Sequence, residues 1–184
     1  MRIEEEIKLD YSDVLFRPKR STLKSRKDVD LNRKYTFKHS RSSWKGIPII
    51  ASNMDGVGEI DVAKKLSSHK LMTALTKQHD INQIGTIYKK NIFFDSIALS
   101  CGTSKDSYNR LNSILKKYPK FKFICIDVAN GYSENFSNFV SEVRKKYPKK
   151  TIIAGNVVTA DMTQELVLSG ADIVKVGIGP GSVC

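Results

Sequence analysis

A glycine-rich loop ending in a cysteine closes the sequence: Lys175-Val176-Gly177-Ile178-Gly179-Pro180-Gly181-Ser182-Val183-Cys184. Its first residues complete an apolar run, so a strand is expected to open into this loop. Glycines there would leave backbone N–H and C=O groups exposed, which suits a phosphate or a desolvated cation. A cysteine at the carboxyl rim of a strand is placed like a nucleophile. On spacing alone, a glycine-rich segment with an incidental thiol explains the same residues equally well.

The other two cysteines, Cys101 and Cys125, fall within apolar runs. Nothing around them indicates a lowered pKa, so we interpret them as core residues. Three cysteines without a Cys-x-x-Cys pair disfavour a disulfide framework or a structural zinc site and are typical of a reducing compartment. The acidic N-terminus lacks the apolar run of a secretory signal, and no apolar run approaches the roughly 20 residues of a membrane helix. We therefore expect a cytoplasmic protein without a membrane partner.

The elements that must position the loop follow from hydrophobic periodicity. Residues 1–46 are polar, and we expect an irregular segment there, followed by one domain over 47–184. From Ile47 onward, short β-branched runs alternate with segments of helical period. This pattern predicts strands over 47–52, 71–75, 94–99, 121–126, 151–154 and 173–176. It predicts helices over about 59–68, 80–90, 105–118, 133–147 and 161–169.

A repeated pentapeptide indicates that the strands are parallel. Lys-Lys-Tyr-Pro-Lys occurs at 116–120 and again at 145–149, each time at the end of an amphipathic stripe and just before a strand. Lysines in the last turn suit the negative end of a helix, and the proline stops it. A helix and a strand in about 29 residues form one βα unit, which implies parallel strands with right-handed crossovers.

Strict alternation leaves two α/β architectures, a doubly wound sheet or part of an eight-stranded barrel. A nucleotide-binding doubly wound sheet carries a glycine-rich turn after its first strand, whereas the turn here reads Ser52-Asn53-Met54-Asp55-Gly56-Val57-Gly58. The glycines gather instead after the sixth strand, which favours a (β/α)8 TIM barrel. A complete barrel has eight strands and about 250 residues, so we expect a barrel truncated after about six strands.

The composition permits a buried core and argues against two other classes. With 184 residues, of which 40% are hydrophobic and 27% charged, the chain is neither disordered nor of low complexity. The formal net charge of +12 invites a nucleic-acid interpretation. Such a module would gather its lysines on one face with interleaved aromatics, but the lysines scatter along the chain. We expect no nucleic-acid partner.

Several motifs together resemble one family. The segment 177–184 resembles the catalytic-cysteine loop of the IMP dehydrogenase/GMP reductase family. Further motifs read like its GMP reductase branch: Asp-Val-Leu-Phe-Arg-Pro-Lys-Arg-Ser at 13–21, Pro-Ile-Ile-Ala-Ser-Asn-Met-Asp at 48–55, Asp-Val-Ala-Asn-Gly-Tyr-Ser at 127–133 and Ala-Gly-Asn-Val-Val-Thr at 154–159. The resemblance runs from Arg2 to Cys184 and implies the barrel fold of that family.

The resemblance also implies a role for particular residues. Cys184 would attack C2 of the purine, which a thiolate does well. A potassium ion would bind to Gly179, Gly181 and Cys184. The implied NADPH contacts are Ser25, Arg26, Lys77, Asp127, Val128, Ala129, Ile178 and Gly179. The implied contacts with the purine nucleotide are Ser52, Met54, Asn156, Gly181 and Ser182. Arg26 suits a 2′-phosphate because its guanidinium is a fixed bidentate donor.

The implied reaction is the NADPH-dependent reductive deamination of GMP to IMP and ammonia through a cysteine thioimidate. The reductase branch is favoured over IMP dehydrogenase because the sequence has no room after Leu75 for an inserted regulatory domain, and because residues 127–133 resemble the reductase motif. The implied partners are GMP and, for a full-length protein, further copies in a tetramer. IMP dehydrogenase and a non-catalytic truncated remnant remain alternatives, and we expect the 184 residues alone to be inactive.

Three residues depart from the family pattern. The family has histidines on both sides of the lysine after the second strand, whereas this chain has Thr76 and Gln78 around Lys77. Gly56 stands where the family usually has threonine. The first departure lies on the cofactor side of the implied site.

Overall fold

The computed structural model describes residues 7, 9, 11–89 and 94–178. The strands of the main sheet are β3 (Ile50–Ala51), β4 (Met72–Leu75), β5 (Ile97–Cys101), β6 (Phe123–Asp127), β7 (Thr151–Val157) and β8 (Ile173–Val176). The helices between them are α1 (Ile60–Ser68), α2 (Ile81–Lys89), α3 (Lys105–Lys117), α4 (Glu134–Lys146) and α5 (Ala160–Leu168). Every predicted strand and helix is present, with ends that differ by a few residues.

Two of the predicted strands are shorter than expected. The run at 47–52 contributes only Ile50–Ala51 to the sheet, because Pro48 has no N–H and the Ile49 N–H turns back to the Ile47 carbonyl at 2.7 Å. The run at 94–99 begins with a 3-10 turn, η3 (Phe94–Ser96), before β5 starts at Ile97. A short loop over residues 76–80 connects Leu75 at the end of β4 to Ile81 at the start of α2, so no further domain is inserted there.

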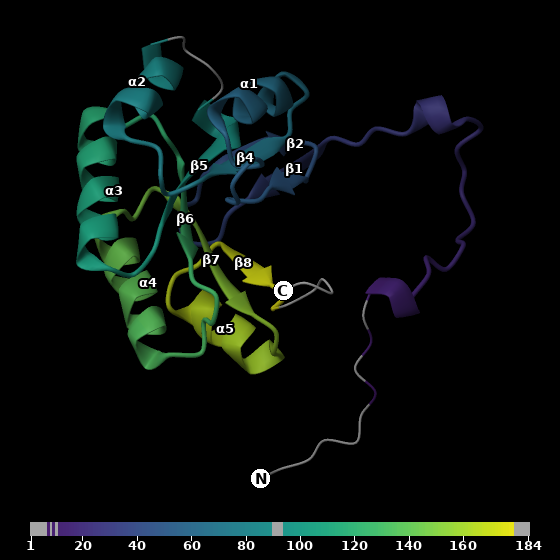
Figure 1. The fold of residues 1–184 in the computed structure, drawn as a ribbon. Helices are drawn as coiled ribbons and strands as arrows, with labels where there is room; N and C mark the ends of the chain where they lie inside the picture. Colours follow the sequence, from purple (N-terminus) through teal and green to yellow (C-terminus); the bar gives the residue numbers. More distant parts are fainter. Residues whose placement is uncertain (1–6, 8, 10, 90–93, 179–184) are drawn as a thin grey trace.

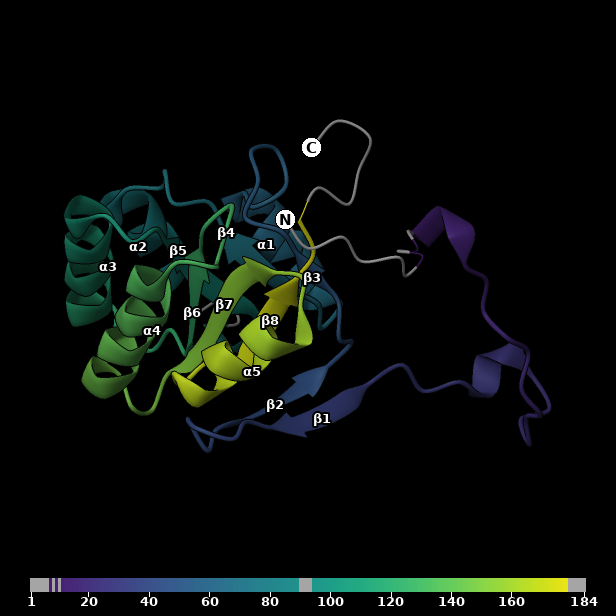
Figure 2. The ribbon, with the colours of Figure 1, turned by 90° about the horizontal axis from the view of Figure 1, so that it is seen from below.

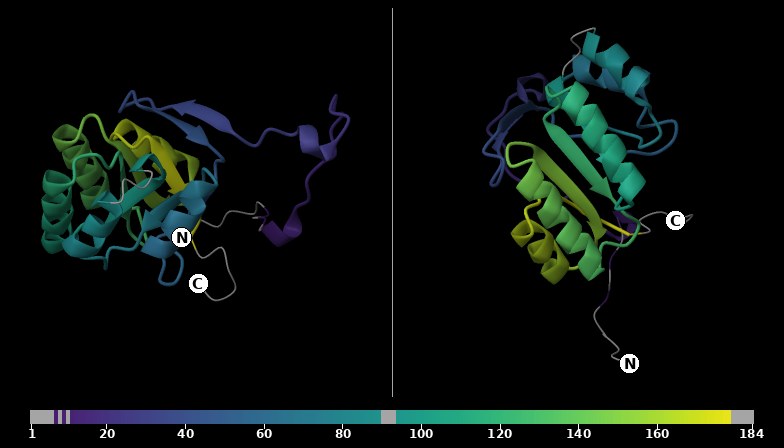
Figure 3. Two further views of the ribbon diagram at one scale, coloured as in Figure 1. Left: turned by 90° about the horizontal axis from the view of Figure 1, so that it is seen from above. Right: turned by 90° about the vertical axis from the view of Figure 1, so that its left-hand side faces the viewer.

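The sheet has the topology of a barrel. Within the described residues its order is β3-β4-β5-β6-β7-β8, and every neighbouring pair is parallel. Because consecutive strands are neighbours and the order never reverses, right-handed crossovers place the helices on one face. The helices lie together along one side of the strands (Figures 1 and 3). The barrel expectation is therefore confirmed over a doubly wound sheet, which has helices on both faces.

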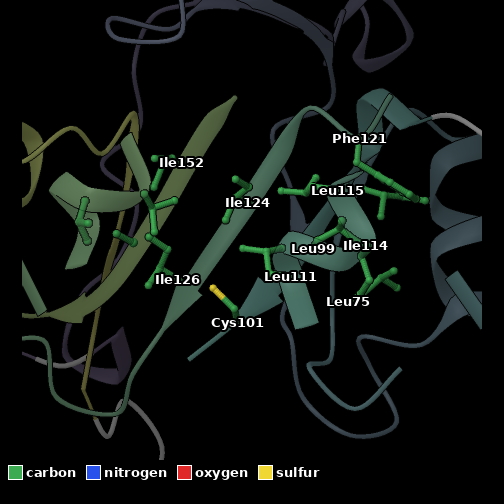
Figure 4. Close-up of a cluster of buried hydrophobic side chains, with 14 of the residues drawn as sticks. Leu75, Leu99, Cys101, Leu111, Ile114, Leu115, Phe121, Ile124, Ile126 and Ile152 are labelled. Carbon is green, nitrogen blue, oxygen red and sulfur yellow. The ribbon is translucent and has the colours of Figure 1, made fainter. Parts of the chain in front are cut away.

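A large apolar core fills the space between the sheet and its helices. It joins outward-facing strand residues such as Leu99, Ile124 and Ile152 to the predicted stripe of α3, where Leu111 and Ile114 are at most 1% exposed. Figure 4 shows these side chains interdigitating, with the Cys101 sulfur among them. The stripe of α4 packs in the same layer through Phe136, Val140 and Val143.

The two copies of the pentapeptide end their helices in the same way. Tyr118 and Tyr147 are the C-cap residues of α3 and α4, and each donates its N–H to a carbonyl four residues back, at 2.7 and 2.9 Å. The proline that follows cannot continue the helix. The repeat therefore marks one βα unit, as its spacing predicted.

A second, smaller cluster lies on the concave face of the sheet. It contains the inward-facing residues Met72, Ala74, Ala98, Phe123, Cys125 and Ile153, joined by Phe37 and Trp44. Phe37 meets Phe123 edge to face, with ring centroids 5.7 Å apart. This concave face is the inner wall of a barrel, and it is filled from its amino-terminal end by residues that precede the first barrel strand.

The expectation of an irregular segment over 1–46 is wrong for its last part. Residues 33–46 form an antiparallel hairpin of β1 (Arg33–Thr36) and β2 (Ser43–Gly46), which lies outside the helix layer (Figure 2). β1 is exposed throughout, and only Trp44 and Gly46 of β2 are buried, so the hairpin lacks a continuous apolar run that would reveal it.

A buried carboxylate fixes this hairpin to the sheet. Asp172, whose side chain is fully buried, accepts hydrogen bonds from the backbone N–H groups of His39 and Ser40, at 2.8 and 3.2 Å. It also forms an ion pair with Arg144 of α4 at 2.6 Å. One side chain therefore connects the hairpin, α4 and the start of β8.

The segment before the hairpin extends away from the body (purple to dark blue in Figures 1 and 2). It contains two 3-10 turns, η1 (Tyr11–Asp13) and η2 (Arg26–Asp28), and the side chains of Leu15 and Phe16 are essentially fully exposed. Among the described residues, none of the helices is long and apolar enough to cross a membrane.

Candidate active site

The implied site residues of the barrel meet at one edge of the sheet. Carboxyl ends of parallel strands share an edge, and in barrels this edge carries the chemistry. Ser52 and Met54 follow β3, Lys77 follows β4, Asp127 ends β6, and Ile178 follows β8. The remaining members on this edge are Val128, Ala129 and Asn156. Gly179, Gly181, Ser182 and Cys184 lie outside the described residues.

The end of β6 is held by the end of β7. Val128 donates its N–H to the Gly155 carbonyl and accepts from the Asn156 N–H, both at 2.9 Å. The N–H of Gly131 donates to the Asn156 carbonyl at 2.8 Å. Backbone hydrogen bonds to β7 therefore fix the turn that carries Asp127, Val128 and Ala129.

Asn156 also connects this turn to the start of the cysteine loop. Its side-chain Nδ2 donates to the Gly177 carbonyl at 2.8 Å, and the Gly177 N–H donates to the Val157 carbonyl at 2.8 Å. Gly177 has a φ of +141°, a conformation that L side chains rarely adopt, so glycine is required where the strand turns into the loop. These hydrogen bonds fix Gly177, the last described glycine before the cysteine loop, beside Asn156 at the end of β7.

A charged pair that sequence reasoning missed lies inside the same edge. Lys175 Nζ contacts Asp127 Oδ1 in an ion pair and donates to Asn53 Oδ1 at 3.1 Å. Lys175 lies on β8 and Asn53 follows β3, so the hydrogen bond joins one edge strand of the described sheet to the loop after the other. The available signal was a lysine flanked by valines in an otherwise apolar strand, at a position that alternation places on the inner face.

The loop after β4 presents Lys77 from a rigid support. Lys77 is exposed, while the neighbouring Thr76 and His79 are buried. The Thr76 N–H donates to the Gly58 carbonyl at 3.0 Å, and His79 Nε2 lies 3.3 Å from Glu59 Oε2. The departure at Thr76 therefore falls on a position that anchors the loop, whereas Gln78 is exposed.

Arg110 of α3 fixes this loop from behind. Its guanidinium donates twice to the His79 carbonyl, through Nε at 3.0 Å and through Nη2, and once to the Ser100 carbonyl at 3.4 Å. Burial lowers the pKa of Arg110, and the nearby Cys101 and Asp80 oppose that change. Sequence reasoning missed Arg110 because it lies on the helix layer, outside every motif.

The third departure, Gly56, occupies a turn after β3. Its φ of +74° lies in the left-handed region, and a Cβ there would meet no atom within 4 Å. A threonine at this position would therefore be opposed by backbone strain rather than by crowding. The loop that carries Ser52 and Met54 has a backbone turn suited to this glycine.

Ser25 and Arg26 lie on the extended N-terminal segment, which the structure does not bring to the other site residues (Figure 1). Both are exposed. Ser25 caps η2, accepting from the Lys27 N–H at 3.2 Å while its own N–H donates to Asp28 Oδ2 at 3.0 Å. Arg26 is the first residue of that capped turn, so its backbone direction is defined locally.

The two described cysteines are poor nucleophiles. Burial raises the pKa of Cys101 to about 12 and that of Cys125 to about 11. Cys101 faces the helix layer and Cys125 the concave face, and neither is in a disulfide. Their interpretation as core residues is confirmed, and the nucleophile expected by resemblance remains Cys184.

Comparison with known proteins places these observations in a family context. A family model described as the IMP dehydrogenase / GMP reductase domain matches residues 8–184. GMP reductases from Yersinia enterocolitica and Caenorhabditis elegans are 54% and 52% identical over 186 and 185 residues, which cover all of this chain. The matches cover 54% and 52% of those proteins, so the chain spans about half the length of the curated relatives it matches.

The fold comparison agrees. The crystal structure of inosine 5′-monophosphate dehydrogenase from Legionella pneumophila superposes with a TM-score of 0.76 at 27% sequence identity. The superposition covers 96% of this chain and 52% of that one. Identity to the GMP reductases is thus about twice the identity to this dehydrogenase.

Proposed function

The chain belongs to the IMP dehydrogenase/GMP reductase family, and on that basis we propose that it supplies the cysteine-loop half of a GMP reductase. The observation that carries this proposal is the hydrogen bond from Asn156 to Gly177. This bond joins Asn156, an implied nucleotide contact, to Gly177, the first residue of the loop that ends in Cys184. The reductase is favoured over the dehydrogenase by the identity of 52–54% to GMP reductases along the whole chain.

The proposed reaction converts GMP, NADPH and two protons to IMP, ammonium and NADP⁺. The Cys184 sulfur attacks C2 of the purine, and the 2-amino group leaves as ammonia after protonation, which forms the thioimidate. Hydride addition to C2 then breaks the C–S bond, which releases IMP and restores the thiolate. This division replaces one difficult substitution by two easier steps.

The described residues at the sheet edge fit a pyridine nucleotide. NADPH would supply the hydride. The Asp127 carboxylate ends a strand at the carboxyl edge, where acidic side chains accept from ribose hydroxyls. The adjacent Val128 is hydrogen-bonded to Gly155 and Asn156 of β7, and Ala129 follows it in the same turn. Lys77 offers a cation on an anchored turn, and Ile178 continues the edge beyond Gly177.

The other proposed contacts complete the site. Ser52, Met54 and Asn156 border the nucleotide together with Gly181 and Ser182. Potassium is proposed at Gly179, Gly181 and Cys184, because backbone carbonyls suit a desolvated monovalent cation.

Assembly and location follow from the same family assignment. We propose a tetramer, which is supported by the extended N-terminal segment, where the apolar side chains of Leu15 and Phe16 are almost fully exposed. We propose the cytoplasm as its compartment, which the two free described cysteines support.

The test uses a hybrid chain in which residues 1–184 precede the second half of the Yersinia enterocolitica GMP reductase. We expect the absorbance of NADPH at 340 nm to fall only when GMP is present. The matched controls are hybrid chains with Cys184→Ala, expected to be inactive, and Cys125→Ala, expected to retain turnover. A hybrid chain that reduces NAD⁺ with IMP but does not oxidise NADPH with GMP would instead establish the dehydrogenase.

A further inference from the structure

Lys175 reaches the inside of the barrel because of its position on β8. Along this strand Ile173 packs on the concave cluster and Val174 on the helix-side core, so Lys175 faces inward again. The neighbouring β7 residue is Gly155, where an added Cβ would lie 2.5 Å from both the Cβ and the carbonyl oxygen of Lys175. A glycine on β7 therefore permits the close approach of β8 at this lysine.

The ammonium and the Asp127 carboxylate are partners in a largely uncharged interior. The other inward-facing residues of the described strands include Met72, Ala98, Ser100, Phe123, Cys125 and Ile153, which carry no charge near neutral pH. The side chains of Lys175 and Asp127 are 26% and 30% exposed, so water screens their interaction only in part. Removing either partner would leave the other charge unpaired on the concave face of the sheet.

The contact to Asn53 extends this pair across the concave face. Lys175 Nζ engages Oδ1 of Asp127 and Oδ1 of Asn53, so one ammonium connects the end of β6 to the loop after β3. In the loop after β3, the N–H groups of Val57 and Gly58 both donate to the Met54 carbonyl, at 3.0 and 2.8 Å. Among the described contacts, Asp127 Oδ2 is left for a further donor.

We infer that Lys175 is a positioning residue that locks Asp127 and the loop after β3 into one arrangement across the inside of the sheet. Its ammonium orients the Asp127 carboxylate, with Oδ1 held and Oδ2 directed to a ligand hydroxyl. The inference rests on the proposed function only in naming NADPH as that ligand. The lock itself is a property of the 184-residue chain and can be measured without turnover.

Hydrogen–deuterium exchange of the 184-residue chain tests the lock. Lys175→Met should make the amides of residues 53–58 and 127–131 exchange about tenfold faster, because the first segment loses a hydrogen bond to Asn53 and the second loses the ion pair with Asp127. Lys175→Arg should restore slow exchange in both segments. Lys64→Met removes a lysine from an exposed ion pair with Asp61 on α1 and should leave both segments unchanged. Unchanged exchange in Lys175→Met would overturn the inference.

Asn53→Ala provides a second test that does not leave an unpaired charge. Because the lock couples the two segments, this variant should also speed exchange at 127–131, which begin at the end of β6, three strands away from β3 in the sheet. Faster exchange confined to 53–58 would contradict the lock. If Lys175→Met does not fold, the exchange pattern of Asn53→Ala tests the inference in its place.

NADPH binding separates this inference from the proposed function. We expect Lys175→Met to weaken NADPH binding to the chain about tenfold relative to wild type and Lys64→Met. Equal NADPH affinity in all three proteins would overturn the positioning role. If the wild-type chain shows the expected exchange pattern but binds no NADPH, the lock stands and the cofactor assignment fails.

Discussion

Lys175 lies on β8 and Asn53 closely follows β3, the two outermost strands of the described sheet, yet the Lys175 Nζ is 3.1 Å from the Asn53 Oδ1. Five strand spacings would separate the edge strands of a flat sheet by about 24 Å. The hydrogen bond therefore requires a sheet that curls until its two edges approach. An apolar cavity of about 440 Å³ near the other end of the strands agrees, because its lining includes both Ile50 of β3 and Ile173 of β8.

The buried ion pair between Asp172 and Arg144 at the base of the hairpin should contribute more to stability than an exposed pair. Asp172→Asn removes the charge that pairs with Arg144 and should lower the free energy of unfolding by about 3 kcal/mol. Asp95→Asn, which breaks an exposed pair with Lys122, should cost no more than about 1 kcal/mol. Urea denaturation measures both values. Equal losses in the two variants would show that Asp172 does not fix the hairpin.

The strands and helices could be predicted because their burial between the sheet and the helix layer leaves a local pattern of apolar residues in the sequence. Cys101 and Cys125 were interpreted correctly for the same reason. The Lys175–Asn53 contact could not be predicted in this way, since it depends on curvature accumulated over the whole sheet. The hairpin was missed because only Phe37 and Trp44 of that region are buried apolar residues. The placement of Arg110 behind the Lys77 loop likewise needed the packed structure.

The raised pKa values of the described cysteines predict selective thiol chemistry. At pH 8, Cys101 and Cys125 remain protonated, so a thiolate-specific reagent should modify one cysteine per folded chain, and none in Cys184→Ala. Titration with an aromatic disulfide, followed by peptide mapping, gives the count. Rapid modification of Cys125 before unfolding would contradict the buried concave face.

The same two thiols predict alkaline destabilisation. Their pKa is higher in the folded chain than the ordinary value of 9.0, so above about pH 9 the unfolded chain loses protons that the folded chain keeps. Below about pH 9 these thiols are protonated in both states and do not change the free energy of unfolding. That free energy should therefore fall as pH rises from about 9 toward 11. Denaturation midpoints for wild type and Cys125→Ala should converge over that range.

Cofactor preference depends on Arg26 in the proposed function. In the hybrid chain, kcat/KM should be higher with NADPH than with NADH, and Arg26→Ala should reduce that preference about tenfold because a bidentate phosphate contact is lost. Arg33→Ala, which also removes an exposed arginine before the sheet, is the matched control. Equal kcat/KM for both cofactors in wild type and Arg26→Ala would remove Arg26 from the site.

The 184-residue chain alone should not oxidise NADPH with GMP. Within the described sheet, the outer edges of β3 and β8 are unpaired and the apolar concave face is open beside them. Open edges favour association between chains, and precise positioning of reacting groups contributes roughly 7–11 kcal/mol to such chemistry. Sizing chromatography should show assemblies, and the 340 nm absorbance should stay constant. A monodisperse monomer that turns over would refute this reasoning.

The central claim is that Cys184 forms a covalent bond to C2 of GMP. The most direct measurement is to incubate the hybrid chain with GMP without NADPH, quench with acid and map the peptides by mass spectrometry. We predict an adduct with the mass of GMP less ammonia on the peptide that contains Cys184, and no adduct in Cys184→Ala. GMP-dependent oxidation of NADPH by a hybrid chain that forms no such adduct, or that forms it at Cys101 or Cys125, would contradict the account.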